Sequence, residues 1–254
     1  MSTLSILDPL KRFIQELGLA GMMFFQCVVL TFTRPFKFDY LLKQMEFVGV
    51  KSVPVVLLTG TFTGMVLALQ TYYGFSKFGA EGLIGITIAL SMTRELGPVL
   101  TGLMVAGRAG SAMAAEIGTM RVTEQIDALL VMALNPVKYL VVPRVLASFA
   151  MLPVLTIIAD FLGISGGYIV AVKLLGVDES AFLNRIYRYL EFQDIYVGLV
   201  KSACFGVIFS VVACYKGFYT KGGAEGVGRA TTEAVVVSCV TILIADYILT
   251  SLLF

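Results

Sequence analysis

Five stretches of this chain combine membrane-spanning length with almost no charge, and this feature constrains the fold more than any other. A helix that crosses the hydrocarbon core of a bilayer needs about 20 mostly apolar residues. The sequence is 58% hydrophobic and only 14% charged, against roughly a quarter charged in soluble domains. We therefore predict an all-α polytopic membrane protein whose five transmembrane helices include residues 52–76, 83–107, 145–172, 195–215 and 234–254.

The first 50 residues are predicted to lie along the membrane surface. Asp8-Pro9 is typical of a helix start. The apolar run that follows, 17–32, has about 16 residues, which is short for a span, and Arg34-Pro35 ends it. An interfacial amphipathic helix is therefore favoured over a sixth span. Residues 1–50 then form the interfacial helix and a connector, and residues 51–254 form the five-span membrane domain.

The distribution of Lys and Arg predicts the orientation. With the N-terminus in the cytoplasm, 14 of the 19 Lys and Arg residues are assigned to the inside and 5 to the outside, and the asymmetry persists without Arg94, which lies within a span. Cytoplasmic loops of membrane proteins carry the excess of positive charge. We therefore expect a cytoplasmic N-terminus and a C-terminus on the opposite side.

Several chemistries are excluded by composition. The chain has no histidine, which removes Ser-His-Asp and Cys-His catalysis and most zinc sites. Its four cysteines lie in apolar segments without CxxC pairing. Residues 223–230 imitate a phosphate loop, but Arg229-Ala230 stands where Lys and Ser/Thr are needed, so we predict a flexible cytoplasmic loop there. We expect no catalytic site, no metal site, no cofactor and no nucleic-acid partner for this chain.

Arg94 and Glu95 lie near the centre of the second apolar run, in the sequence ALSMTRELGP. Each would cost about 2.5–3.5 kcal/mol at the middle of a bilayer, so both must face protein or a wet cavity. One interpretation is a structural pair that fastens this helix to its neighbours, with Asp160, Asp246 and Lys201 as available partners. The favoured interpretation is a polar point in a substrate cavity.

Residues 104–136 change character along their length. Gly107, Ser111 and Ala115 recur at helical spacing and permit close backbone approach, either within the chain or between two copies. Charges return in 116–127 while an apolar stripe persists, which predicts an amphipathic cytoplasmic helix between spans two and three. This helix is either a surface helix without a specific partner or, in the more specific interpretation, a docking helix for a soluble partner.

At this point the sequence resembles a known family. The motif LSMTRELGPVLTGLMVAGRAGSAMAAEIGTMRVTEQIDAL is similar to the signature of MlaE/YrbE-type permeases, the membrane subunits of Mla (maintenance of lipid asymmetry) ABC transporters. GTFTGMVLALQ in the first span and GVGRATTEAVV before the fifth fit the same family, as do LPVLTIIADFLGISGG and LVKSACFGVIFSVVACYKGF in the third and fourth spans. The resemblance covers nearly all of the chain after Lys51.

The resemblance implies a homodimer in the inner membrane that moves phospholipid to or from a periplasmic MCE-domain carrier. The energy would come from a separate cytoplasmic ATPase that binds ATP and Mg²⁺, and many such systems add a STAS-domain subunit. Residue by residue, it implies a lipid cavity lined by Leu67, Gln70, Arg94, Glu95 and Leu96. It also implies ATPase coupling through Arg121, Glu124, Gln125 and Asp127.

Other function classes stay open on the sequence. An ion-coupled secondary transporter could work through Glu95, Asp160 and Asp246, although no internal inverted repeat is evident. A lipid-modifying membrane enzyme would need a nucleophile and base that the sequence does not offer. A protein that serves only as an assembly scaffold is the last alternative, but it would not explain why the second span carries Arg94 and Glu95.

Overall fold

The computed structural model describes residues 4–33 and 38–253, with side chains from Gln15 onwards except Leu17. The described residues form helices and turns and contain no strand. The helices are α1 (Leu4–Thr31), α2 (Phe38–Val48), α3 (Val53–Phe75), α4 (Ile84–Ser91), α5 (Gly97–Val105), α6 (Ser111–Val122), α7 (Gln125–Val131), α8 (Val142–Tyr168), α9 (Glu179–Tyr189), α10 (Phe192–Phe218) and α11 (Gly223–Leu253).

Five helical runs are long and apolar enough to cross a membrane, which confirms the predicted fold class. Two of them join several α-helices through 3₁₀ or π turns, and a third consists of α8 with a π turn at each end. Residues 18–31 of α1 form a shorter apolar stretch, below spanning length, as expected for an interfacial helix. The helix around it begins at Leu4, before Asp8-Pro9. The five runs are Phe38–Phe78, Glu81–Val122, Val137–Leu174, Phe192–Phe218 and Gly223–Leu253.

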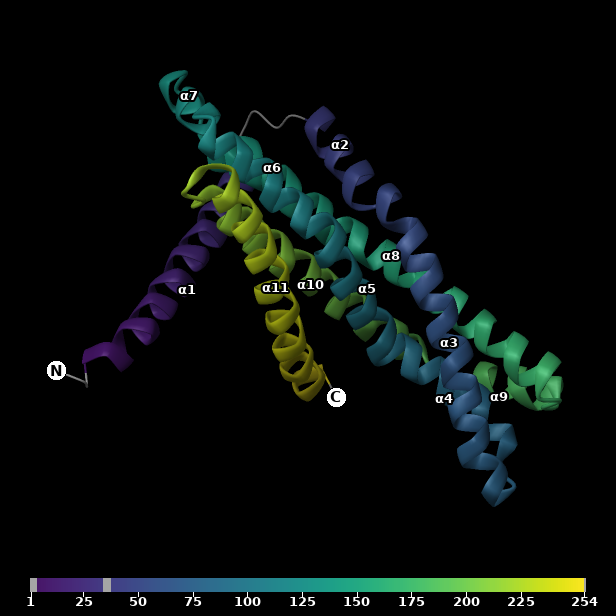
Figure 1. The fold of residues 1–254 in the computed structure, drawn as a ribbon. Helices are drawn as coiled ribbons and strands as arrows, with labels where there is room; N and C mark the ends of the chain where they lie inside the picture. The colour runs from purple at the N-terminus through teal and green to yellow at the C-terminus, as the bar shows by residue number, and fades with distance from the viewer. Residues whose placement is uncertain (1–3, 34–37, 254) are drawn as a thin grey trace.

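Helix α10 lies at the centre of the bundle. It packs against α8, α11 and α6, while α3 lies on the far side of α8 (Figure 1). Helix α1 diverges from the bundle, and α7 projects from one end of it (Figure 1). We refer to the end that carries α7 as the α7 end and to the opposite end, where α4 meets α9, as the α9 end.

Small residues bring α3 and α8 together. A Cβ atom added to Gly64 would lie 1.8 Å from the carbonyl oxygen of Gly163, and one added to Gly60 would lie 2.9 Å from the carbonyl oxygen of Ala159. Any larger side chain would separate the two backbones at these positions. Small residues at four-residue spacing are the usual means of close helix association in lipid.

At the α9 end, helix α9 begins at an N-cap. The Ser180 hydroxyl and the Ala181 N–H donate hydrogen bonds to the Asp178 carboxylate, and these bonds lower the pKa of that carboxyl below its ordinary value. Phe182 is fully buried beneath α9, whereas Tyr187 is exposed. The helix therefore lies with one apolar face on the bundle and the other side outward.

The helix predicted for residues 116–127 is not continuous. Residues up to Val122 continue α6, and α7 starts only at Gln125. Glu124 between them adopts a left-handed backbone conformation with φ of 62°. That conformation interrupts the helical path and turns the chain, so the connection between spans two and three is a corner followed by a short helix. An ion pair of 2.7 Å between Arg121 and Asp127 bridges the corner.

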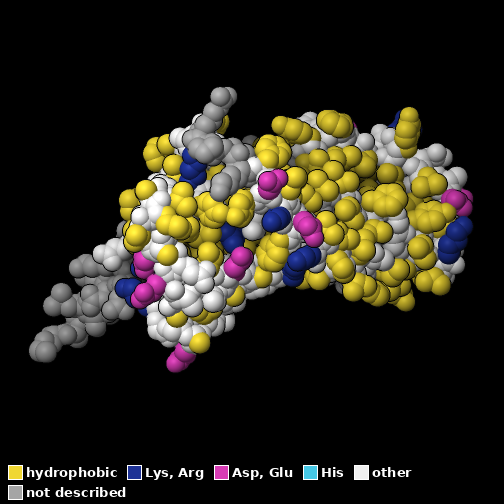
Figure 2. Space-filling model, turned by 90° about the horizontal axis from the view of Figure 1, so that it is seen from above, with side chains coloured by type: hydrophobic (Ala, Val, Ile, Leu, Met, Phe, Trp, Pro, Cys, Tyr) yellow, Lys and Arg dark blue, Asp and Glu magenta, His cyan; other side chains and the backbone are white. Residues whose placement is uncertain are grey.

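Charged and apolar side chains occupy different parts of the surface. In Figure 2, hydrophobic side chains cover most of the part that contains the α9 end, and most charged groups in view lie toward the α7 end. The long runs of exposed apolar residues on α3 and α11 belong to helices of membrane-spanning length. This pattern is the one expected of helices that face lipid.

Candidate functional site

Arg94 and Glu95 lie on a π turn, Met92–Leu96, that interrupts the second span. Pro98 follows and has no backbone N–H to donate to the Arg94 carbonyl four residues earlier. The Lys201 ammonium group of α10 donates to that carbonyl at 3.0 Å instead. The π turn and the proline thus leave the Arg94 carbonyl oxygen available as an acceptor for the Lys201 ammonium group of α10. Single π turns inside α-helices occur frequently at functional sites.

Lys201 is the centre of a charged cluster that joins three helices. Its ammonium group lies 2.6 Å from Glu95 and 2.7 Å from Asp246 of α11, and it donates to the Thr250 hydroxyl at 2.9 Å. The Lys201 side chain is completely buried, whereas 39% of the Glu95 side chain is exposed. A buried ammonium group without partners would be very costly, so these carboxylates are what allows Lys201 to lie inside the bundle.

Arg94 makes a separate ion pair with Asp194 of α10. The Arg94 Nε atom donates to Asp194 Oδ1 at 2.8 Å, and Nη2 lies 2.5 Å from the same oxygen. The second Asp194 oxygen accepts the Glu191 N–H in the capping box of α10. Asp194 is buried, but 38% of the Arg94 side chain remains exposed. The guanidinium group therefore fastens α10 while keeping one side open.

These contacts answer the question of what the intramembrane charges pair with. Of the three candidate partners, Lys201 and Asp246 join the cluster. Asp160 does not: it lies against Gly97, and its Oδ1 atom has no hydrogen-bond partner among the described residues. Asp194 was not predicted from the sequence as a partner of Arg94, because it lies just outside the apolar run 195–215. Its position seven residues before Lys201, on the same face of α10, was the signal that could have identified it.

The depth of Arg94 also differs from the sequence estimate. The apolar run 83–107 has Arg94 near its middle, but the helical run in the structure extends over 42 residues, Glu81–Val122. Arg94 lies in the first third of that run. It is level with Asp194, which stands in the first turn of α10, and is therefore nearer to the α9 end than to the centre of the bundle.

Three of the predicted cavity residues meet in one hollow. Leu67 and Gln70 of α3 and Leu96 of the π turn line a hollow of about 330 Å³, together with Phe62, Thr63 and Val66. A second hollow of about 490 Å³ continues along α3 and shares Val66 and Gln70 with the first. Because the two hollows share residues, they form one groove, which we call the α3 groove. Arg94 and Glu95 lie on the same π turn as Leu96.

The predicted coupling residues are grouped at the corner between α6 and α7. Arg121 lies in the last turn of α6, Glu124 forms the corner, and Gln125 and Asp127 lie in the first turn of α7. The tip beyond them is apolar and exposed: the exposed fraction is 89% for Val131, and Leu130, Met132 and Leu134 are exposed as well. The corner projects from the bundle (Figure 1). Both its charged residues Glu124 and Asp127 and the apolar tip are exposed.

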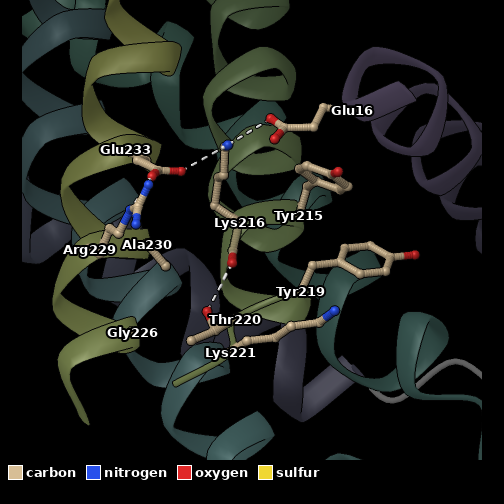
Figure 3. Close-up of a pocket in the computed structure, with 10 residues that line it drawn as sticks. All are labelled: Glu16, Tyr215, Lys216, Tyr219, Thr220, Lys221, Gly226, Arg229, Ala230 and Glu233. Carbon is tan, nitrogen blue, oxygen red and sulfur yellow. Dashed lines mark hydrogen bonds and ion pairs between the residues drawn. The ribbon is translucent and has the colours of Figure 1, made fainter. Parts of the chain in front are cut away.

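A further hollow, of about 230 Å³, lies at the α7 end between α1, α10 and the start of α11 (Figure 3). The Lys216 ammonium group points between two carboxylates and lies 2.8 Å from that of Glu16 and 3.1 Å from that of Glu233. The guanidinium group of Arg229 also pairs with the Glu233 carboxylate, at 2.9 Å. The prediction of a flexible loop at 223–230 is wrong, since these residues form the first turns of α11. Gly222 and Gly223, both with positive φ, make the turn that starts this helix directly.

The fold and the site together define a multi-pass membrane protein with a charged cluster inside the bundle and an open groove on one span. The family model described as Permease MlaE matches residues 41–252. The chain belongs to the MlaE permease family, and is a transport component rather than an enzyme.

Relatives support the same assignment over nearly the full length. The chain is 48% identical to a probable ABC transporter permease protein of Rickettsia typhi, over 96% of this chain and 94% of the relative. It is 40% identical to the intermembrane phospholipid transport system permease protein MlaE of Haemophilus influenzae, over 95% and 93%. It is 44% identical to the chloroplastic protein TRIGALACTOSYLDIACYLGLYCEROL 1 of Arabidopsis thaliana, over 84% and 61%. These similarities and the five apolar runs indicate a multi-pass protein of the inner membrane.

Proposed function

We propose that this ABC transporter permease moves phospholipid between the inner membrane and a periplasmic MCE-domain carrier. The α3 groove is the observation that carries the proposal, because it brings Leu67, Gln70 and Leu96 together beside two partly exposed charged side chains. The groove is apolar along most of its length, as acyl chains require, and Arg94 and Glu95 at its flank provide polar contacts. The name of the Haemophilus influenzae relative, which refers to phospholipid transport, supports this cargo.

The energy for transport is proposed to come from a separate cytoplasmic ATPase, which would bind ATP and Mg²⁺. The corner between α6 and α7 is the surface we assign to it. Arg121, Glu124, Gln125 and Asp127 supply charge there, and the exposed tip around Val131 supplies an apolar anchor. Apolar anchors surrounded by a polar rim are typical of protein interfaces. A STAS-domain subunit beside the ATPase is a further component that such a system can include.

We also propose a homodimer. Gly107 faces open space, with no atom of this chain within 4 Å of a Cβ placed on it, and Ser111 and Ala115 are partly exposed. This small-residue face is therefore available to a helix from outside the chain, and a second copy is the partner that we assign to it.

The proposed orientation places the α7 end in the cytoplasm and the C-terminus in the periplasm. Cysteine labelling from the periplasm, in a variant whose native cysteines are replaced, tests it. Ser180→Cys at the α9 end should be labelled and Gly222→Cys at the α7 end should not. Labelling in the opposite pattern would reverse the orientation.

Glu124→Lys tests the assignment to an ABC transporter with an ATPase at the corner. The side chain is exposed, so the variant should reach the membrane in normal amount, while the ATPase that co-purifies with the wild-type chain should be lost or its activity uncoupled from lipid transfer. Asp39→Lys, an equally exposed acidic position on α2, is the matched control and should retain the ATPase. If no ATPase co-purifies with the wild-type chain, an ion-coupled carrier working through Glu95, Asp160 and Asp246 becomes the better explanation.

A further inference from the structure

Helix α3 has two faces with different residue types. Its buried face carries small residues at four-residue spacing, including Gly60, Gly64 and Ala68, and packs on α8. Its open face carries large side chains along a stripe that advances by three or four residues. The members of this stripe on α3 are Phe62, Val66, Leu69, Gln70 and Tyr73, and Lys77 continues it in the 3₁₀ turn Ser76–Phe78 that directly follows α3. All six line the α3 groove.

The groove has the length of one phospholipid. Phe62 and Lys77 are 15 residues apart, so at 1.5 Å per residue the stripe is about 22 Å long. Half of a bilayer, from the midplane to the outside of the head groups, is about 20–22 Å thick. One lipid molecule aligned with α3 would therefore extend from Phe62 to Lys77.

The two ends of the groove differ in chemistry. At the deep end, Phe62, Leu67 and Leu96 offer apolar surface, and Thr63 is the one hydroxyl side chain among the lining residues there. At the α9 end, the groove is lined by Tyr73 and Lys77, which carry a phenol and an ammonium group. Lys77 is exposed and takes part in no ion pair with the residues that the structure describes. Its charge therefore remains available to a ligand.

Arg94, on the same π turn as Leu96, and Lys201 of the charged cluster are in a different situation. Lys201 is buried and surrounded by Glu95, Asp246 and Thr250, and the Arg94 guanidinium group holds the buried carboxylate of Asp194. A phosphate group that approached Arg94 would have to compete with Asp194 for it. A phosphate group at Lys77 meets no such competitor.

We propose that phospholipid lies along α3 with its phosphate at Lys77 and its acyl chains between Phe62, Leu67 and Leu96. Tyr73, one helical turn deeper than Lys77, is about 6 Å further along the groove and lies at the level of the glycerol esters. The inference rests on the proposed function and deepens it, because it gives the cargo an orientation and assigns Lys77 as the residue that binds the phosphate.

Two photoreactive phosphatidylethanolamine probes in the purified complex test this orientation. One carries a diazirine on the head group and the other carries it at the end of an acyl chain. Modified residues are mapped by mass spectrometry. We expect the head-group probe to label 73–78 and the acyl probe to label 62–67 and Leu96. Head-group labelling at Arg94 instead, with acyl labelling near Lys77, would overturn the orientation while the proposed cargo stands.

Failure of the proposed function gives a different result. If neither probe labels α3 or Leu96 while a crosslink from position 66 captures a second copy of the chain, the groove is a protein interface. In that case both the cargo site and its orientation are wrong.

Substitution of Lys77 tests the charge directly. Lys77→Gln should reduce head-group labelling at position 73 by about three- to tenfold, the range expected for loss of one partly exposed charge-assisted hydrogen bond, and Lys77→Arg should retain it. Lys51→Gln, at the other end of α3 and outside the groove, is the matched control and should show wild-type labelling. Equal labelling in Lys77→Gln and wild type would remove Lys77 from the site.

Discussion

The charged cluster around Lys201 and the α3 groove are neighbours with opposite characters. Lys201 at the centre of the cluster is buried, and its ammonium group is paired across three helices with the carboxylates of Glu95 and Asp246. The groove is open and largely apolar, and Lys77 at its end belongs to none of the ion pairs among the described residues. Charged residues within a span thus hold the helices together here, and the surface suited to a lipid lies on an apolar helix beside them.

The comparison shows that intramembrane charge and ligand contact are separable properties. A charge inside a bilayer requires a partner, and that partner is most economically another helix. Once paired, the charge stabilises the fold and fixes the π turn on which Leu96 faces the groove. Arg94 and Glu95 belong to both regions, because each is ion-paired on one side and more than one third exposed on the other.

The largest expected effect is on the cluster. Lys201→Met leaves Glu95 and Asp246 facing each other across the bundle without a cation, and loss of one partner from a buried ion pair costs about 3–5 kcal/mol. We expect a large drop in the unfolding temperature of the purified protein in detergent. Adding Glu95→Gln and Asp246→Asn to the same variant should recover most of the loss. A single variant as stable as wild type would show that the cluster does not hold the helices.

A smaller effect is expected at the boundary between the two regions. Arg94→Ala leaves the buried Asp194 carboxylate with the Glu191 N–H but without its cation, which should cost about 1–3 kcal/mol. Arg94→Ala combined with Asp194→Asn should be more stable than Arg94→Ala alone. Unfolding in detergent and lipid transfer are measured on the same preparations. A stable Arg94→Ala protein that has lost lipid transfer would instead place Arg94 among the cargo contacts.

The smallest effect on stability is expected in the groove. Val66 is 56% exposed and lines both hollows, so Val66→Trp should fill the groove while the free energy of unfolding changes by about 0.5 kcal/mol or less. Labelling by the acyl-chain probe should fall sharply. Leu58→Trp, an exposed position on α3 outside the groove, is the control and should leave labelling unchanged. Normal labelling in Val66→Trp would separate the groove from the lipid site.

The sequence by itself determined the five spans and the position of the charges along them. Charge-free runs of this length can be satisfied only by helices in a bilayer, because every backbone polar group must then be paired within its own segment. The sequence also indicated that Arg94 and Glu95 need partners and that Lys201 and Asp246 could supply them. Each of these inferences depends only on local composition and on the cost of a charge in lipid.

Only the tertiary structure decided which charges meet and which surface stays open. The spans are apolar on nearly every side, so no amphipathic stripe in the sequence specifies how each helix is rotated. Rotation and depth follow from contacts such as Gly198 of α10 on the Thr93 carbonyl group, and these bring Lys201 to Glu95 and Asp194 to Arg94, whereas Asp160 stays outside the cluster. The corner at Glu124 was likewise hidden, because its left-handed backbone is compatible with the sequence without being required by it. Helix composition is a local property, but helix rotation is set by the neighbours.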